Sequence, residues 1–149
     1  MADNVISKFQ MKSCTTHRFN FAAPSSGSIA KLSINHHFSG KYIADYSNNK
    51  WIGMIMVHYS AKATDENEPF SVDIVMDGLY EYDAANSPEE RDSFKRMLTM
   101  NGAVALITML RGQVATTTTA LGLTPSLIVP SVNLNHFHWE EQELPAAVE

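Results

Sequence analysis

Four long segments with the pattern of β-strands follow one another in this chain before any helical pattern begins. They span about residues 5–21, 30–38 with a resumption at 42–46, 51–64 and 70–82, and short turns connect them. Consecutive strands joined by short turns pair antiparallel, because a parallel pair needs a long crossover connection. The pattern therefore predicts a four-stranded antiparallel sheet rather than alternating strands and crossover helices.

Two positions predict special backbone geometry in this sheet. Asn48-Asn49 separates the second and third segments, and asparagine tolerates the positive φ of a hairpin turn. Asp77-Gly78 lies in the middle of the fourth segment and predicts a bulge or bend in that strand. The third segment begins with apolar residues on both faces, which predicts a strand that is central or covered on both sides.

Helical signals begin only after the fourth strand. Ser87-Pro88-Glu89-Glu90 combines an N-cap serine, a proline at the first helical position and a glutamate at the third. This start predicts a short helix to about Met100, a break at Asn101-Gly102, and a longer helix over residues 103–121 that Gly122 ends. Residues 136–143 are expected to form a last short helix. The predicted fold is α+β, with a short and a long helix packed on one face of the sheet.

The bulk properties indicate an ordinary globular protein. A chain of 149 residues with 44% hydrophobic residues predicts a single domain over residues 1–149, with short flexible tails at about 1–4 and 144–149. Cys14 is the only cysteine, which favours a reducing compartment. The sequence shows neither a signal-peptide pattern nor a membrane-length apolar stretch, so we expect a cytoplasmic protein without membrane insertion. The net charge of -5 and the scattered basic residues argue against nucleic-acid binding.

No motif predicts catalysis, a cofactor or a metal site. The chain has no glycine-rich phosphate loop and no nucleophile elbow, and Cys14 within a strand fits a packed thiol better than a nucleophile. His36 and His37 face opposite sides of a strand, and His136-x-His138 lacks a third ligand at a known spacing. We therefore predict a non-enzymatic protein. A small-molecule binder or enzyme with a pocket between sheet and helix, and a structural oligomer, stay open as alternatives.

Four segments resemble the SecB family of export chaperones, and the resemblance covers about residues 9–137. Residues 9–12 with 19–24 resemble the first strand of that family, residues 70–80 the fourth strand, and residues 101–122 the long helix. Residues 122–134 are the most specific, because their order of Gly, two Pro and Val-Asn is similar to the family's Gly-x-x-Pro-x-Leu-x-Leu-x-Pro-Val-Asn-Phe tail. Ser131 is a one-residue insertion in this motif.

The resemblance implies a function in holding unfolded polypeptides. SecB-like proteins are homotetramers built as dimers of dimers, and they hold client chains on apolar grooves without ATP. We accordingly expect unfolded or partly folded polypeptides as partners, and a homo-oligomer that is a dimer or a tetramer. Eight methionines suit an adaptable apolar surface, although any one of them can equally fill the core. The candidate client-binding residues are Phe9, Phe19, Phe21, Leu32, Ile34 and Trp51.

The sequence departs from the family where SecB proteins bind the translocase ATPase SecA. That surface uses acidic and apolar residues of the sheet, and the aligned positions here include Arg18, Ala22 and Ser71. Asp73 keeps its carboxylate, so Asp73 and Asp77 are candidate remnants of a partner-docking surface. The alternative is a solvated acidic edge of the sheet. We expect docking to SecA to be weak or absent, because a basic partner would meet a partly reversed potential.

Overall fold

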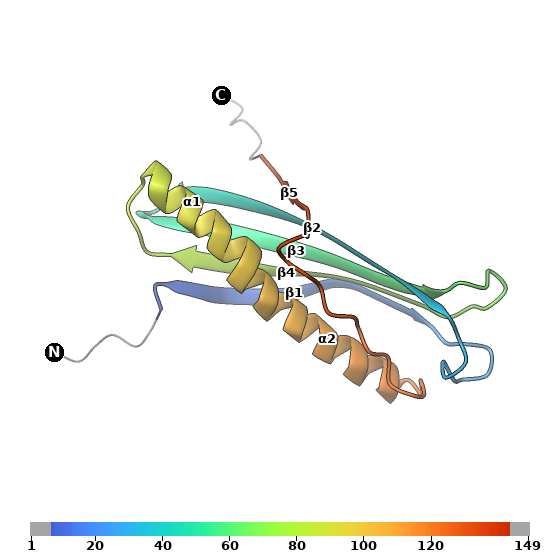
Figure 1. Cartoon of the computed structure of the whole chain (residues 1–149). Coiled ribbons are helices and arrows are strands. Elements are labelled where there is room, and N and C mark those ends of the chain that lie inside the picture. The colour runs from blue at the N-terminus through green and yellow to red at the C-terminus, as the bar shows by residue number, and fades with distance from the viewer. Residues whose placement is uncertain (1–6, 144–149) are drawn as a thin grey trace, which may run out of the picture.

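The computed structural model describes residues 7–143, so the predicted tails at 1–4 and 144–149 lie outside the described residues. The α+β class is confirmed: one sheet carries helical structure across one face (Figure 1). The sheet has five strands in the order β1-β4-β3-β2-β5. They are β1 (Phe9–Ala22), β2 (Ile34–Ser47), β3 (Lys50–Ala63), β4 (Ser71–Tyr82) and β5 (Trp139–Glu141).

The prediction of four antiparallel strands is wrong because the C-terminal segment adds a fifth. Strand β5 pairs parallel with β2, whereas β1, β4, β3 and β2 pair antiparallel, so the sheet is mixed. The helix expected over residues 136–143 is therefore also wrong. A segment of that length is marginal as an isolated helix, and here its backbone pairs with the open edge of β2 instead.

The hairpin prediction at Asn48-Asn49 is confirmed. Both residues have positive φ, 55° and 62°, and Ser47 pairs with Lys50 across the two-residue turn. The second strand differs from its prediction at its start and in its middle, because β2 begins at Ile34 and runs to Ser47 without interruption. The predicted central position of β3 is confirmed, since it pairs along its length with β2 and β4.

The predicted bulge in the fourth strand is wrong, and the irregularities lie in its neighbour β1. Lys12 and His17 are extra residues in the ladder between β1 and β4, whereas β4 pairs with β3 without a shift. Each bulge moves the side chains that follow it to the opposite face of the sheet. After two bulges, Phe19 and Phe21 therefore lie on the same face as Phe9. Gly78 has another role: a Cβ there would lie 2.9 Å from the Tyr80 ring.

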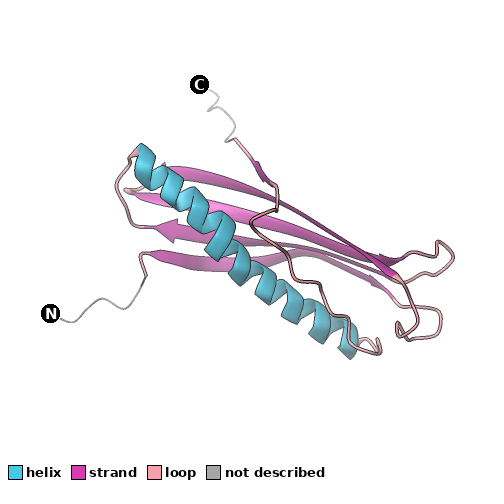
Figure 2. Ribbon diagram, in the orientation of Figure 1, coloured by secondary structure: helices cyan, strands magenta, loops and turns pink. Residues whose placement is uncertain are grey.

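One continuous helical rod replaces the two predicted helices (Figure 2). It consists of α1 (Pro88–Met97), a π-helical turn η1 (Leu98–Gly102) and α2 (Ala103–Ala120). The predicted cap is confirmed, since the Ser87 hydroxyl accepts a hydrogen bond from the Glu90 amide at 3.2 Å. The predicted break at Gly102 is wrong, because Gly102 keeps helical φ and ψ of -63° and -42°. Gly122 ends the rod as predicted, with φ of 93°.

The core lies between this helical rod and one face of the sheet, which we call the inner face. Strand β3 alternates strictly here: Ile55, Val57 and Tyr59 are fully buried on the inner face, and Leu106, Leu110 and Val114 of α2 are buried with them. The residues between them on β3 point to the opposite, outer face and are partly exposed. Within residues 7–143, no helix is long and apolar enough to cross a membrane.

Gly102 is a glycine because the helix passes close to Tyr80. A Cβ on Gly102 would lie 3.2 Å from the Tyr80 ring, and the Tyr80 hydroxyl donates a hydrogen bond to the Gly102 carbonyl at 2.7 Å. Both groups are buried, so this bond ties the helical rod to β4 at the π-helical turn. Burial raises the pKa of Tyr80, which keeps the hydroxyl protonated as the donor.

We expect Tyr80→Phe to lower the free energy of unfolding by about 0.5–1.5 kcal/mol, because the buried hydrogen bond between the helix and β4 is lost. Tyr82→Phe is the matched control, since the Tyr82 hydroxyl bonds the Glu90 carboxylate in a half-exposed setting where water can replace it. Urea denaturation followed by circular dichroism measures both. Equal losses for the two variants would show that the bond to Gly102 does not stabilise the helix on the sheet.

Candidate protein-binding site

A groove lies along α2 on the side where the chain runs back after the helix. The returning segment, residues 123–138, follows the helix toward β5 (Figure 1). Its Leu123, Leu127 and Val129 are buried in the core. Ile128 points the other way and is 76% exposed. The groove has a volume of about 370 Å³, and its lining residues are Thr108, Arg111, Gly112, Ala115, Ser126, Leu127, Ile128 and Val129.

The outward side of α2 is unusually poor in charge. Arg111 is the only charged residue in its 18 residues. Val104 and Met109 are 55% and 47% exposed, and beside them lie small or threonine side chains. A solvated helix ordinarily carries charged residues on its outer face, so this composition is typical of a surface that contacts another chain. Sequence analysis missed this surface, although the run from Ala103 to Ala120 with one charge was its signal.

Two of the six predicted client-binding residues lie under α1. Trp51 is 5% exposed, its indole Nε1 donates to the Ala85 carbonyl at 3.1 Å, and its ring lies 6.1 Å from that of Phe94. The Phe9 ring stacks on Tyr80 at 5.1 Å and packs against the core. Phe9 and Trp51 belong to one row of side chains across the sheet, because both pair with Tyr82.

The other four predicted residues lie at the far end of the inner face. Phe19, Phe21, Leu32 and Ile34 are partly buried against the core. Phe21 pairs with Val72 of β4, and Val72 pairs with Ala61 of β3. Ala61 lies ten positions after Trp51, which is about 33 Å along a strand. The six residues therefore do not converge on one compact site, and their role in client binding stays a prediction. None of them lines the groove beside α2.

Asp73 and Asp77 lie on the outer face of the sheet, where each carboxylate has a basic partner. Asp73 accepts a hydrogen bond from Arg18 Nε at 2.6 Å, and His58 Nε2 lies 2.7 Å from its other oxygen. Asp77 is only 8% exposed and pairs with His17, a bulged residue of β1. Arg18 therefore neutralises Asp73. This pairing adds to the difference, already seen in the sequence, from the acidic surface with which SecB proteins bind SecA.

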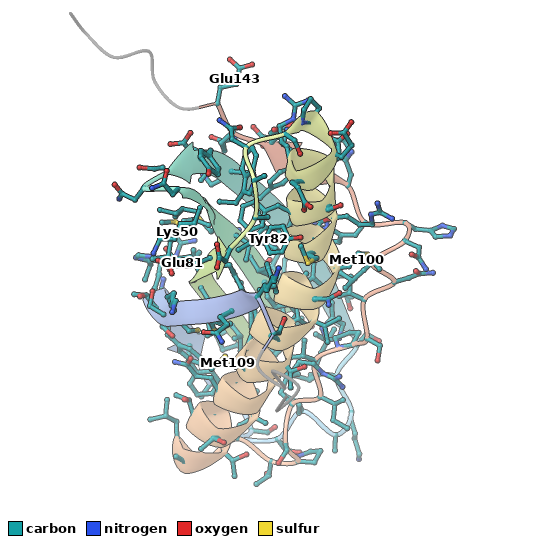
Figure 3. All side chains as sticks on the ribbon, turned by 90° about the vertical axis from the view of Figure 1, so that its left-hand side faces the viewer. Lys50, Glu81, Tyr82, Met100, Met109 and Glu143 are labelled. Atoms are coloured by element: carbon teal, nitrogen blue, oxygen red, sulfur yellow. The ribbon has the colours of Figure 1, made fainter. Side chains whose placement is uncertain are left out.

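Asp73 and Asp77 do not form a solvated edge of the sheet, because β4 lies between β1 and β3. Glu81, farther along β4, lies 3.0 Å from Lys50 Nζ, and both residues are labelled in Figure 3. Lys12 Nζ lies 3.6 Å from the same carboxylate. Hydrogen bonding to Lys50 is the main reason that the pKa of Glu81 falls below its usual value. Beside these ion pairs the outer face also carries apolar side chains, including the 38% exposed Met54.

His36 and Cys14 lie in the sheet, and neither belongs to a metal-binding cluster of the described residues. Within residues 7–143, no group of three or more His, Cys, Asp or Glu side chains could hold a metal ion. His36 faces inward and bonds the Tyr59 hydroxyl at 2.7 Å. Burial, and then the charge of Asp77, raises the pKa of the Cys14 thiol, which disfavours the nucleophilic thiolate.

Comparison with solved structures shows a SecB-like fold. The chain is similar to the Mycobacterium tuberculosis Rv1957 SecB-like chaperone, whose structure is a complex with a ChAD peptide from the Rv1956 HigA1 antitoxin. The TM-score is 0.55 at 17% sequence identity, covering 83% of this chain and 90% of the other. A Streptococcus agalactiae protein of unknown function matches with a TM-score of 0.49 at 11% identity, covering 83% and 97%. No protein-family model and no curated protein matches the sequence.

Asp73 gives a pH-dependent test of the outer-face ion pairs. Burial alone would raise its pKa, but the hydrogen bonds from Arg18 and His58 outweigh burial and lower the pKa below 3.8. Between the pKa of Asp73 in the folded chain and 3.8, this carboxylate binds protons more readily in the unfolded chain than in the folded one. The ion pair therefore stabilises the fold fully above pH 3.8, and this stabilisation is lost as the pH falls through the folded pKa.

We expect Asp73→Asn to lower the free energy of unfolding by about 1 kcal/mol at pH 7, a loss that disappears at strongly acidic pH. Asp45→Asn is the control, because Asp45 is an exposed carboxylate on the same face. Denaturant unfolding between pH 2 and pH 7 measures both variants. A loss with Asp73→Asn that does not change with pH would contradict the ion-pair assignment.

Proposed function

We propose that this chain is a divergent SecB-like, ATP-independent chaperone that holds unfolded polypeptides. The observation that carries the proposal is the groove beside α2, whose wall includes the 76% exposed Ile128, in a fold similar to that of a SecB-like chaperone. A protein that holds unfolded chains must present apolar surface to solvent and must bind the unfolded state preferentially. The proposed role is non-enzymatic and cytoplasmic, within a single domain.

The groove suits an extended peptide better than a folded partner. Gly112 leaves open space on the helix, because nothing lies within 4 Å of where its Cβ would be. Exposed Ile128 forms the opposite wall, and Arg111 supplies one positive charge for a client carbonyl or carboxylate. Such a surface offers apolar contact with few directional bonds, which permits binding of many sequences.

Gly112 and Ile128, which line the groove from opposite sides, are the two positions at which client binding is tested. We expect the native chain to suppress aggregation of a chemically denatured client without ATP. Gly112→Glu and Ile128→Lys should each weaken suppression several-fold, because a charge in the groove opposes burial of apolar client side chains. Gly112→Ala and Ala30→Lys are the controls: the first fits the open space, and the second adds a charge to an exposed loop.

Light scattering of the client during refolding measures this effect, with circular dichroism confirming that each variant is folded. Suppression that is unchanged in both groove variants would contradict the assignment of the groove. A chain that never suppresses aggregation would contradict the chaperone function itself.

We propose that the charge-poor side of α2 joins copies of the chain into a dimer or tetramer. Met109 would be buried there, since it is 47% exposed and is not among the residues that line the client groove. Fully burying such a side chain contributes about 1.5–3 kcal/mol, and a contact between copies gains this from each of them. Docking to SecA is not part of the proposal, because Arg18 pairs with Asp73, one of the two candidate docking carboxylates.

We expect Met109→Glu to reduce the molar mass measured by multi-angle light scattering, because it places a charge in the proposed contact between copies. Met109→Leu is the matched control and should keep the mass, since volume and polarity change little. A native chain that is monomeric at micromolar concentration would refute the oligomer.

A further inference from the structure

Strand β5 fills a notch that the edge strand β2 provides on the inner face of the sheet. Inward-facing residues of β2 include Phe38, Gly40 and Tyr42, so an aromatic row is interrupted once by a residue with no side chain. Trp139 pairs with Gly40, and its ring occupies the gap. A Cβ on Gly40 would overlap the Trp139 ring and would lie 2.9 Å from the Phe137 ring. The notch therefore depends on glycine at this position.

Polar groups hold the other end of the same segment. Glu141 pairs with Tyr42 in the ladder, and its carboxylate lies 2.5 Å from Lys95 Nζ of α1. The Gln142 amide donates to the Tyr42 carbonyl at 2.7 Å. Hydrogen bonding to Lys95 is the main reason that the pKa of Glu141 falls, so the carboxylate is ionised near neutral pH. Phe137, Trp139 and Glu141 thus contact this site at alternate positions.

This attachment is short and incompletely satisfied. Strand β5 has 3 residues, whereas β2 has 14. Most of the edge of β2 that faces away from β3 therefore has no partner in β5. Trp139 Nε1 is buried without a hydrogen-bond partner among residues 7–143. An unsatisfied buried donor costs about 1–3 kcal/mol, which weakens the binding of this segment. A short strand at a sheet edge can separate without unfolding the core.

We propose that the edge of β2 around Gly40 is a second client-binding site and that residues 137–141 are its built-in competitor. The site would accept an extended segment that has aromatic side chains at two alternate positions and a carboxylate two residues later. Binding would add a parallel strand to β2, with one ring in the Gly40 notch and the carboxylate at Lys95. This inference rests on the proposed chaperone function, because it names the class of client segment and the regulation of its binding.

The competitor lowers apparent affinity without preventing binding. A tethered segment competes at a high effective concentration, and the apparent dissociation constant of a client rises in inverse proportion to the fraction of open site. Only clients that engage the first groove and the β2 edge together would displace it efficiently. Segment 137–141 would thereby select long unfolded chains over short peptides.

The test uses the full chain and a fluorescein-labelled peptide with the sequence of residues 135–142. Phe137→Ser combined with Trp139→Ser should release the competitor, and fluorescence anisotropy should then show binding at least about tenfold tighter than with the native chain. Glu141→Ala should give a smaller gain while keeping all the apolar contacts, which covers the case in which the double variant does not fold. His138→Ala is the control, because His138 lies between Phe137 and Trp139 in the sequence but its side chain is exposed.

Adding Gly40→Val to the double variant should abolish peptide binding, because the side chain fills the notch. The inference is overturned if releasing the competitor does not tighten binding, or if binding survives Gly40→Val. These outcomes are separable from failure of the chaperone function. Aggregation suppression without peptide binding would support the chaperone function and contradict the site at β2. Peptide binding without suppression would support the site and contradict the chaperone function.

Discussion

Burial of one sheet face under a single helical rod is the contact on which the rest of the structure depends. Ile55, Val57 and Tyr59 of β3 supply the sheet side, and buried residues of α2 supply the other. A helix packed on an open sheet covers only that face. The outer face of the sheet and the outer side of α2 are consequently left for solvent or for partners. They differ in character, because the first carries paired charges and the second is poor in charge.

The sequence predicted what depends on short-range patterns. Asn48-Asn49 specified its turn because few residues tolerate positive φ, and Ser87 specified the helix start because its cap lies within one turn. The fold similarity to SecB-like proteins was predicted from residues 122–134 and is supported by the structural comparison. These features require no knowledge of which distant segments come together.

The errors concern contacts between distant residues. Gly102 has the local signature of a break, but Tyr80 on β4 needs the space and the carbonyl, so the helix continues there. Gly78 has the signature of a bulge, yet its lack of a side chain leaves room for the same Tyr80 ring. Strand β5 was missed because its partner, Gly40, lies about a hundred residues earlier in the chain. Of the candidate site, sequence patterns found aromatic residues near the core and missed the charge-poor side of α2.

The functional account separates an apolar client groove from a neutralised outer face, and site-specific photo-crosslinking tests that separation most directly. A photoreactive amino acid placed at Ile128 reports on the groove, and one placed at Met54 reports on the outer face, since both side chains are exposed. With a permanently unfolded client, the account predicts crosslinks from position 128 and few from position 54. Equal crosslinking from both positions, or crosslinking from position 54 alone, would contradict it.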